Sequence, residues 1–177
     1  MPKIKGYWFL FFILVILIIL NFSHRLYFNI FTHSLPSGIY LRINGVPERN
    51  DYAATCLTTN IARYGIARGY LEQGICSSGS VLVLKIIRGM PGDNFEVKDG
   101  VFKINGQSYP LMALDSRGRD LKVFYSKTGR VAQGKYILLS GYVKNSWDSR
   151  YFGPVTVQFL LKPLWTLGQY IDMHVHV

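Results

Sequence analysis

The chain has 177 residues, with 20 lysines and arginines against ten aspartates and glutamates, and a formal charge of +10. This length suits one domain with its own core and argues against two, because single domains cluster around roughly 100 to 150 residues. The basic residues are scattered, so no nucleic-acid-binding stripe is expected, and attraction to anionic lipid headgroups is the simpler explanation of the charge.

The first predicted element is an apolar segment at 7–22, which carries no charge and in which Asn21 is the one clearly polar residue. Together with Gly6 it reaches the lower limit of about 17 residues for crossing a bilayer. A cleaved secretory signal is the alternative, but no small-residue cleavage pattern follows in 21–28. We therefore expect residues 1–23 to form a cytoplasmic tip and an uncleaved transmembrane anchor.

The charges flanking this segment predict its orientation. Lys3, Lys5 and the amino terminus precede it, whereas Arg25 follows it closely. Because positive charge is enriched on the cytoplasmic side, the N-terminus is expected in the cytoplasm. Residues 24–177 would then lie outside the inner membrane, which in a bacterium is the periplasm.

A serine follows the anchor in a segment rich in turn residues. Ser34 begins the run S-L-P-S-G-I-Y at 34–40. Pro36 fixes its own φ and Gly38 can adopt conformations closed to other residues, so Ser34 is expected at the entrance of a rigid turn. Rigid placement suits a nucleophile, although such residues are also ordinary turn punctuation.

Two cysteines come next, Cys56 and Cys76. In the predicted topology they face an oxidising compartment, where pairing is permitted, and closing a loop of about 20 residues would contribute roughly 3 kcal/mol. The sequence permits this disulfide without requiring it. Neither cysteine has a partner at the short spacing of redox or metal sites, so no metal and no cofactor are expected.

Lys85 interrupts an apolar run. Residues 81–84 precede it and 86–87 follow it, as expected of a strand covered on both faces. An enclosed lysine loses hydration of its charged form, and lowering its pKa from about 10.4 to near 7 corresponds to roughly 4 to 5 kcal/mol. A neutral amine can accept the proton of a serine hydroxyl. The alternative is a strand-end lysine whose ammonium lies in water.

The remainder is expected to be mostly β, as short strands broken by turns, with no long amphipathic helix. Asp99-Gly100 lies between apolar alternating segments within 95–104, which predicts a two-residue hairpin. A second turn is expected at Asn105-Gly106. Further strands are expected at 122–125 and 136–139, and an exposed charged loop at 115–120.

The last group of candidate functional residues consists of Ser146, Asp148 and Arg150. On an extended chain these alternate residues share one side, so the two charged side chains can pair and the hydroxyl can orient an amine. A structural ion pair is the simplest interpretation. His33 competes as a base, but it adjoins Ser34, and neighbours in an extended chain point to opposite faces.

Three segments in this order resemble the conserved boxes of bacterial type I signal peptidases. They are S-L-P-S-G-I-Y at 34–40, V-L-V-L-K-I-I-R-G-M-P-G-D at 81–93 and S-W-D-S-R-Y-F-G-P-V at 146–155. The chain is most similar to the compact branch of conjugal transfer signal peptidases, the TraF type, and residues 162–165 also suit it. The likeness covers residues 1 to about 167.

The resemblance implies a fold and a set of roles. The fold is a signal-peptidase-like antiparallel β-sheet domain over 24–177, with the accessory domain of larger enzymes reduced to a small cap at 98–135. Those larger enzymes carry Gly-Asp-Asn-Arg ahead of the last box, where this chain has different residues at 140–145. The implied roles are nucleophile for Ser34, general base for Lys85, oxyanion hole for Thr32 and the Ser34 N–H, orientation of the lysine for Ser146, and bracing for Asp148 and Arg150.

The function implied is a membrane-anchored serine endopeptidase that removes leader peptides after a small residue. The TraF type further implies a membrane-tethered pilin precursor as substrate, and in some members an amine of the same chain replaces water and closes a cyclic pilin. The sequence does not distinguish hydrolysis from ligation and does not specify an oligomeric state. Two alternatives are a general preprotein signal peptidase and a non-catalytic membrane-anchored β subunit of a conjugation or secretion channel.

Overall fold

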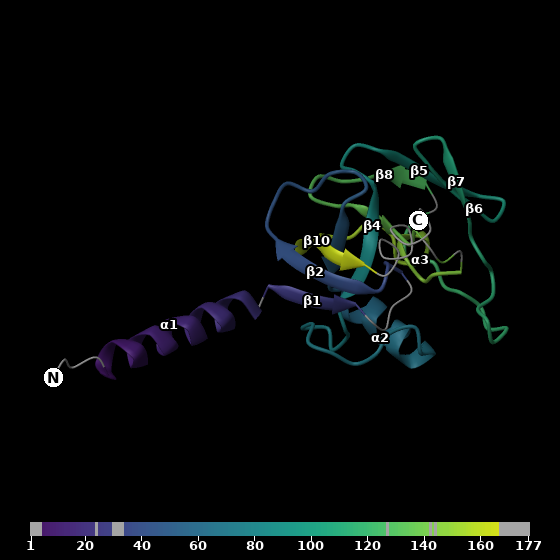
Figure 1. Ribbon diagram of the computed structural model, residues 1–177. Coiled ribbons are helices and arrows are strands. Elements are labelled where there is room, and N and C mark those ends of the chain that lie inside the picture. Colours follow the sequence, from purple (N-terminus) through teal and green to yellow (C-terminus); the bar gives the residue numbers. More distant parts are fainter. Residues whose placement is uncertain are drawn as a thin grey trace, which may run out of the picture.

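The computed structural model describes residues 5–23, 25–29, 34–126, 128–141, 143 and 145–166, with side chains of the first helix described for 7–17. This helix, α1 (Lys5–Ser23), extends away from a body made largely of strands (Figure 1). Within the described residues, no helix combines the length and hydropathy that a bilayer crossing requires.

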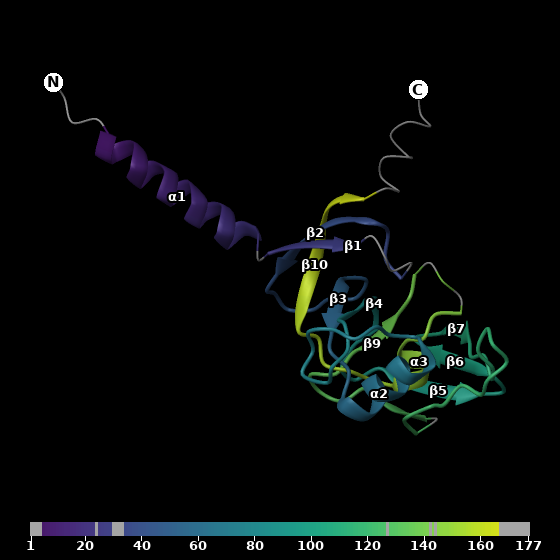
Figure 2. The same ribbon diagram turned by 90° about the horizontal axis from the view of Figure 1, so that it is seen from below.

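The body is built on a six-stranded sheet in the order β1-β2-β10-β3-β4-β9 (Figure 2). Every neighbouring pair is antiparallel, as the sequence predicts. The strands are β1 (Leu26–Asn29), β2 (Gly38–Ile43), β3 (Tyr52–Thr55), β4 (Val83–Gly89), β9 (Ile137–Leu139) and β10 (Phe159–Thr166).

Strand β4 lies between β3 and β9 and is covered on both faces. Its odd positions, including Val83 and Ile87, pack in one apolar cluster, and its even positions Leu84 and Ile86 pack in another. This arrangement explains the continuous apolar run in the sequence, because alternate side chains of a strand point to opposite faces. Lys85 stands in the middle of this strand, opposite Ala53 of β3.

A second, four-stranded sheet has the order β7-β6-β5-β8. The predicted hairpin is present, since Asp99-Gly100 joins β5 to β6. The predicted turn at Asn105-Gly106 forms a second hairpin between β6 and β7, and all four turn residues have positive φ. The predicted cap at 98–135 overlaps this sheet, which begins earlier. Its strands are β5 (Asn94–Lys98), β6 (Val101–Ile104), β7 (Gln107–Pro110) and β8 (Thr128–Arg130).

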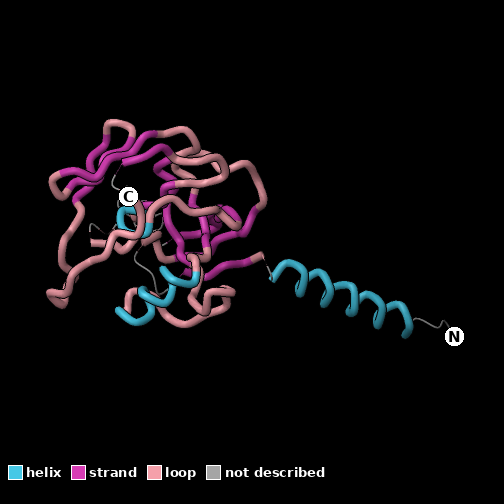
Figure 3. Tube along the Cα trace, turned by 180° about the vertical axis from the view of Figure 1, so that it is seen from behind, coloured by secondary structure: helices cyan, strands magenta, loops and turns pink. Residues whose placement is uncertain are grey.

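The two sheets share a core. Phe95 and Phe102 of the second sheet pack in one cluster with Ile137 and Leu139 of β9. The second sheet thus lies against the β9 end of the main sheet, away from α1 (Figures 1 and 3). Burial of these aromatic and aliphatic side chains is the main contribution that joins the sheets.

One expectation about secondary structure was wrong, and one helix was not predicted. The expected strand at 122–125 is irregular, because Phe124 packs edge-on against Tyr64 with centroids 5.1 Å apart and its N–H donates to the Tyr151 carbonyl at 2.8 Å. A helix not predicted from the sequence, α2 (Thr59–Arg68), supplies that tyrosine and ends at Gly69, whose φ is 72°. Helix ends of this kind favour glycine.

The loop at 115–120 also differs from a simple exposed loop. The Asp115 side chain is 5% exposed and pairs with Arg119 at 2.7 Å. It also accepts a hydrogen bond from the Tyr70 hydroxyl at 2.6 Å. The loop is therefore fastened to the segment that follows α2.

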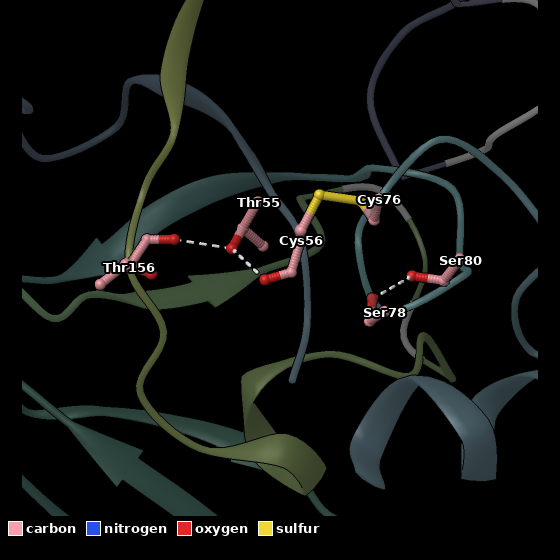
Figure 4. The surroundings of a disulfide bond; sticks show 6 residues. All are labelled: Thr55, Cys56, Cys76, Ser78, Ser80 and Thr156. Carbon is pink, nitrogen blue, oxygen red and sulfur yellow. Dashed lines mark hydrogen bonds between the residues drawn. A yellow bond between two sulfur atoms is a disulfide. The ribbon is translucent and has the colours of Figure 1, made fainter. Parts of the chain in front are cut away.

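A disulfide joins Cys56, directly after β3, to Cys76 in the loop that leads into β4 (Figure 4). Cys76 is buried in the same cluster as Leu82 and Leu84, so the bond anchors this loop to the core. Beside it, Thr55 Oγ1 donates to a main-chain carbonyl at 2.6 Å. The segment between α2 and β4 is thereby held at its middle.

Candidate active site

The two residues at the centre of the predicted site meet in the structure. Lys85 Nζ donates a hydrogen bond to Ser34 Oγ across a sequence separation of 51 residues. Lys85 is 5% exposed within β4, and Ser34 is half-buried in the turn that precedes β2. A hydroxyl and an enclosed amine in contact are the arrangement that can exchange a proton.

The turn that carries Ser34 is held by neighbouring side chains. Leu35 is buried, and its carbonyl accepts from Asn29 Nδ2 at 3.1 Å. The Pro36 carbonyl accepts from the same amide at 3.1 Å and from the Tyr40 hydroxyl at 2.6 Å. These contacts reach the turn from the strands on either side of it, β1 and β2, so the turn is rigid as the sequence suggests.

Burial lowers the pKa of Lys85 from the usual 10.5 to about 8. The Asp148 carboxylate opposes this shift and the Arg150 guanidinium adds to it. The decrease is smaller than the sequence-based expectation of a value near 7, because a nearby carboxylate favours the charged amine. A substantial fraction of the amine is neutral at mildly alkaline pH.

Asp148 and Arg150 form a buried ion pair with two contacts, Nε to Oδ1 at 2.8 Å and Nη2 to Oδ2 at 3.0 Å. The sequence predicts the pair on an extended chain, but Asp148 instead caps α3 (Ser149–Phe152) by accepting from the Arg150 N–H at 3.1 Å. The guanidinium also donates to the carbonyls of Pro110 at 2.7 Å and Ser146 at 2.9 Å. The pair therefore links the second sheet to the last box.

A cavity of about 470 Å³ opens beside Ser34 and Lys85. Part of its wall comes from Tyr70 and Trp147, whose ring centroids lie 5.5 Å apart. Neither residue was predicted from the sequence as part of the site. The position of Trp147 inside the box at 146–155 is the feature that could have indicated it. The cavity provides room for an extended peptide segment next to the hydroxyl.

The other predicted site residues differ in their placement. Ser146 lines the cavity, but among the described residues no hydrogen bond joins its hydroxyl to Lys85. Thr32, the predicted oxyanion-hole residue, and His33 lie outside the described residues. Their roles stay predictions.

The family model described as "Signal peptidase, peptidase S26" matches residues 5–161. A conjugal transfer protein TraF of Agrobacterium tumefaciens (strain 15955) is 35% identical over 102 residues, which are 56% of this chain and 57% of that protein. A plasmid transfer protein TraF of Escherichia coli is 30% identical over 129 residues, which are 70% of this chain and 72% of that protein.

Among solved structures, a signal peptidase I from Enterococcus faecalis V583 is 23% identical with a TM-score of 0.39, and the match covers 68% of this chain and 100% of that chain. The chain spans little more than half of the Agrobacterium relative. The family model covers most of the sequence and confirms the resemblance to signal peptidases. The chain is a member of the peptidase S26 family of signal peptidases, of the TraF type.

Proposed function

We propose that this protein is a serine endopeptidase that removes leader peptides with Ser34 as nucleophile and Lys85 as general base. The observation that carries the proposal is the hydrogen bond between the two side chains at the edge of the 470 Å³ cavity. The lowered pKa of Lys85 supports it, because only the neutral amine can accept a proton. Membership of a peptidase family supports the same reaction class.

In this mechanism the neutral Lys85 amine takes the Ser34 proton as Oγ attacks the carbonyl carbon of the scissile bond. The resulting oxyanion would be stabilised by the Ser34 N–H and the Thr32 hydroxyl, as the family resemblance implies. The ammonium then returns the proton to the leaving amine, and an acyl-enzyme remains. Water, deprotonated by Lys85, releases the acyl group and restores the serine.

The proposed substrate is a pilin precursor with small side chains at the first and third positions before the cut. The names of the relatives, which refer to conjugal and plasmid transfer, support a conjugative role. Where the cut leaves the pilin chain itself as the acyl group on Ser34, the amino terminus of that chain could replace water in the last step and yield a cyclic product. Mass spectrometry of the product distinguishes the two outcomes, because cyclisation leaves the released chain lighter by one water.

We further propose that α1 anchors the protein in the bacterial inner membrane with the β body in the periplasm. Large apolar side chains such as Trp8, Leu10 and Phe12 are exposed along α1, and the disulfide suits an oxidising compartment. The test is extraction of cell membranes with alkaline carbonate and protease treatment of spheroplasts. Release by carbonate, or protection of the body from protease, would contradict the anchor or its orientation.

The central experiment incubates the full-length protein in detergent with a synthetic precursor that has alanine at the two specified positions. Ser34→Ala and Lys85→Ala are each expected to abolish cleavage, whereas Lys103→Ala, an exposed lysine, retains it. Undiminished processing by both site variants would favour the non-catalytic channel subunit. Restored growth of cells depleted of their own signal peptidase would indicate a general preprotein peptidase instead.

A further inference from the structure

The main chain around the nucleophile is held from two directions. The carbonyls of residues 34–36 all accept hydrogen bonds from side chains. Asn29 and Tyr40, which hold the second and third carbonyls, belong to strands on either side of the turn itself. The first carbonyl, that of Ser34, instead accepts from Ser140 Oγ at 3.5 Å across 106 positions of sequence.

Further hydrogen bonds fix Ser140 itself. Its N–H donates to Asp148 Oδ2 at 3.1 Å, and its Oγ accepts from the Val143 N–H at 3.1 Å. A hydroxyl both donates and accepts, so Ser140 Oγ can donate to the Ser34 carbonyl while one of its lone pairs accepts from the Val143 N–H. The buried ion pair therefore reaches the nucleophile through this serine.

The position of Ser140 in the fold explains how its contact with the Ser34 carbonyl can affect the site. It follows Leu139, the last residue of β9, which pairs with Ile86 next to Lys85. Ser140 thus joins the turn that carries the nucleophile to the part of the sheet that carries the base. Its place is also the start of the segment 140–145, where this chain departs from the Gly-Asp-Asn-Arg of larger signal peptidases.

We propose that Ser140 is a positioning residue that holds the main chain of Ser34 beside Lys85. The inference rests on the proposed dyad and adds a residue to it. A hydrogen bond of 3.5 Å is long, but contacts in unliganded active sites tighten as the substrate complex forms. A small displacement of a nucleophile from its base is enough to reduce the rate of the chemical step.

The first test compares Ser140→Ala and Ser140→Gly with the wild type in precursor cleavage. Both variants keep the N–H bond to Asp148, and Ser140→Ala removes only the hydroxyl, so kcat is expected to fall about 5-fold with KM unchanged. Ser149→Ala is the matched control, since Ser149 Oγ is a buried hydroxyl that accepts from the Leu138 N–H at 2.9 Å in the same corner. It is expected to lower the melting temperature and leave kcat unchanged.

The second test needs no substrate. The chain's two cysteines are paired, so Ser34→Cys introduces a single free thiol. Its alkylation by iodoacetamide at pH 7 should be accelerated by the neighbouring ammonium, and Lys85→Ala measures the loss of that effect. Adding Ser140→Ala is expected to slow alkylation about 3-fold, whereas adding Ser149→Ala is not.

The outcomes separate this inference from the proposed function. If the wild type cleaves no precursor but the alkylation rate depends on Ser140, the proposed peptidase activity is contradicted and the positioning role of Ser140 is supported. If the Ser140 variants show wild-type kcat and wild-type alkylation, the positioning role is overturned and the proposed peptidase activity is unaffected. Equal effects of Ser149→Ala and Ser140→Ala in both assays would also overturn it, because the hydroxyl would then act on general stability.

Discussion

At the scale of single residues, the fold disfavours the charged form of Lys85, because burial lowers the pKa of its amine. Its pKa is about 8 in the fold and near 10.5 when exposed, so between these values the unfolded chain binds more protons. The free energy of unfolding therefore rises with pH across this window and is lowest, with respect to this group, below pH 8. The difference corresponds to roughly 3 kcal/mol.

Lys85→Met is therefore expected to abolish cleavage and to stabilise the protein at pH 7 by up to about 3 kcal/mol. The gain should shrink above pH 8 and vanish near pH 10.5, where the wild-type lysine is neutral in both states. Urea unfolding of both proteins at pH 7 and pH 10 measures it. A gain that does not depend on pH would show that packing, and not charge, is responsible.

The rate of cleavage should follow the same titration. Below pH 8, kcat/KM is expected to rise about tenfold per pH unit and to level off above it, because the neutral amine is the base. A pH series with the synthetic precursor provides the measurement, with circular dichroism at each pH as the control for folding. A flat profile between pH 6 and 8 would exclude Lys85 as the titrating base.

At the scale of elements, the pairing of β2 with β10 depends on a close approach at Gly38. A Cβ there would lie 2.2 Å from the Trp165 carbonyl oxygen and 2.8 Å from the Thr166 Cα, both main-chain atoms that cannot move independently. Gly45, just beyond the same strand, has space, since its nearest contact would be Leu160 Cδ1 at 3.6 Å. A side chain at Gly38 would therefore push the two strands apart, whereas a side chain at Gly45 would fit.

Gly38→Ala is expected to destabilise the protein by about 3 kcal/mol, because the strands must separate. Gly45→Ala is expected to change stability by less than about 0.5 kcal/mol. Urea midpoints of the two variants test the difference. Equal midpoints would mean that the β2–β10 pairing yields at this position without loss.

At the scale of the whole molecule, the two sheets meet around a buried charge. Apart from their shared apolar core, Arg150 joins Pro110 at the end of β7 to Asp148 and Ser146 beside the main sheet. Removing one partner of a buried pair leaves the other uncompensated, which is much more damaging than the loss of a surface contact. The same pair also supports Ser140, so architecture and site share one network.

Arg150→Leu is expected to lower the free energy of unfolding by about 3 to 5 kcal/mol, since Asp148 would stay buried without its partner. Arg130→Leu is the matched control, because its exposed guanidinium donates to the Gly92 carbonyl at the edge of the second sheet. Its effect should be below about 1 kcal/mol. Similar losses in both variants, measured by urea unfolding, would contradict the role of the buried pair.

The sequence alone was sufficient for features that depend on neighbours along the chain. The hairpin at Asp99-Gly100 and the turn at Asn105-Gly106 follow from residues that adopt positive φ readily, and the buried strand follows from the apolar residues on both sides of Lys85. Three short boxes sufficed to identify the family. Each of these signals is contained within a few residues.

Only the tertiary structure decided which distant residues meet. The contact between Ser34 and Lys85, the irregular path at Phe124, and the placement of Trp147 and Ser140 depend on packing between segments far apart in sequence. Local propensity does not encode such contacts, because their free energy comes from burying surfaces that the chain brings together only on folding. The conserved boxes indicated which side chains are candidates for the site, and the packing of the strands determined where those side chains lie.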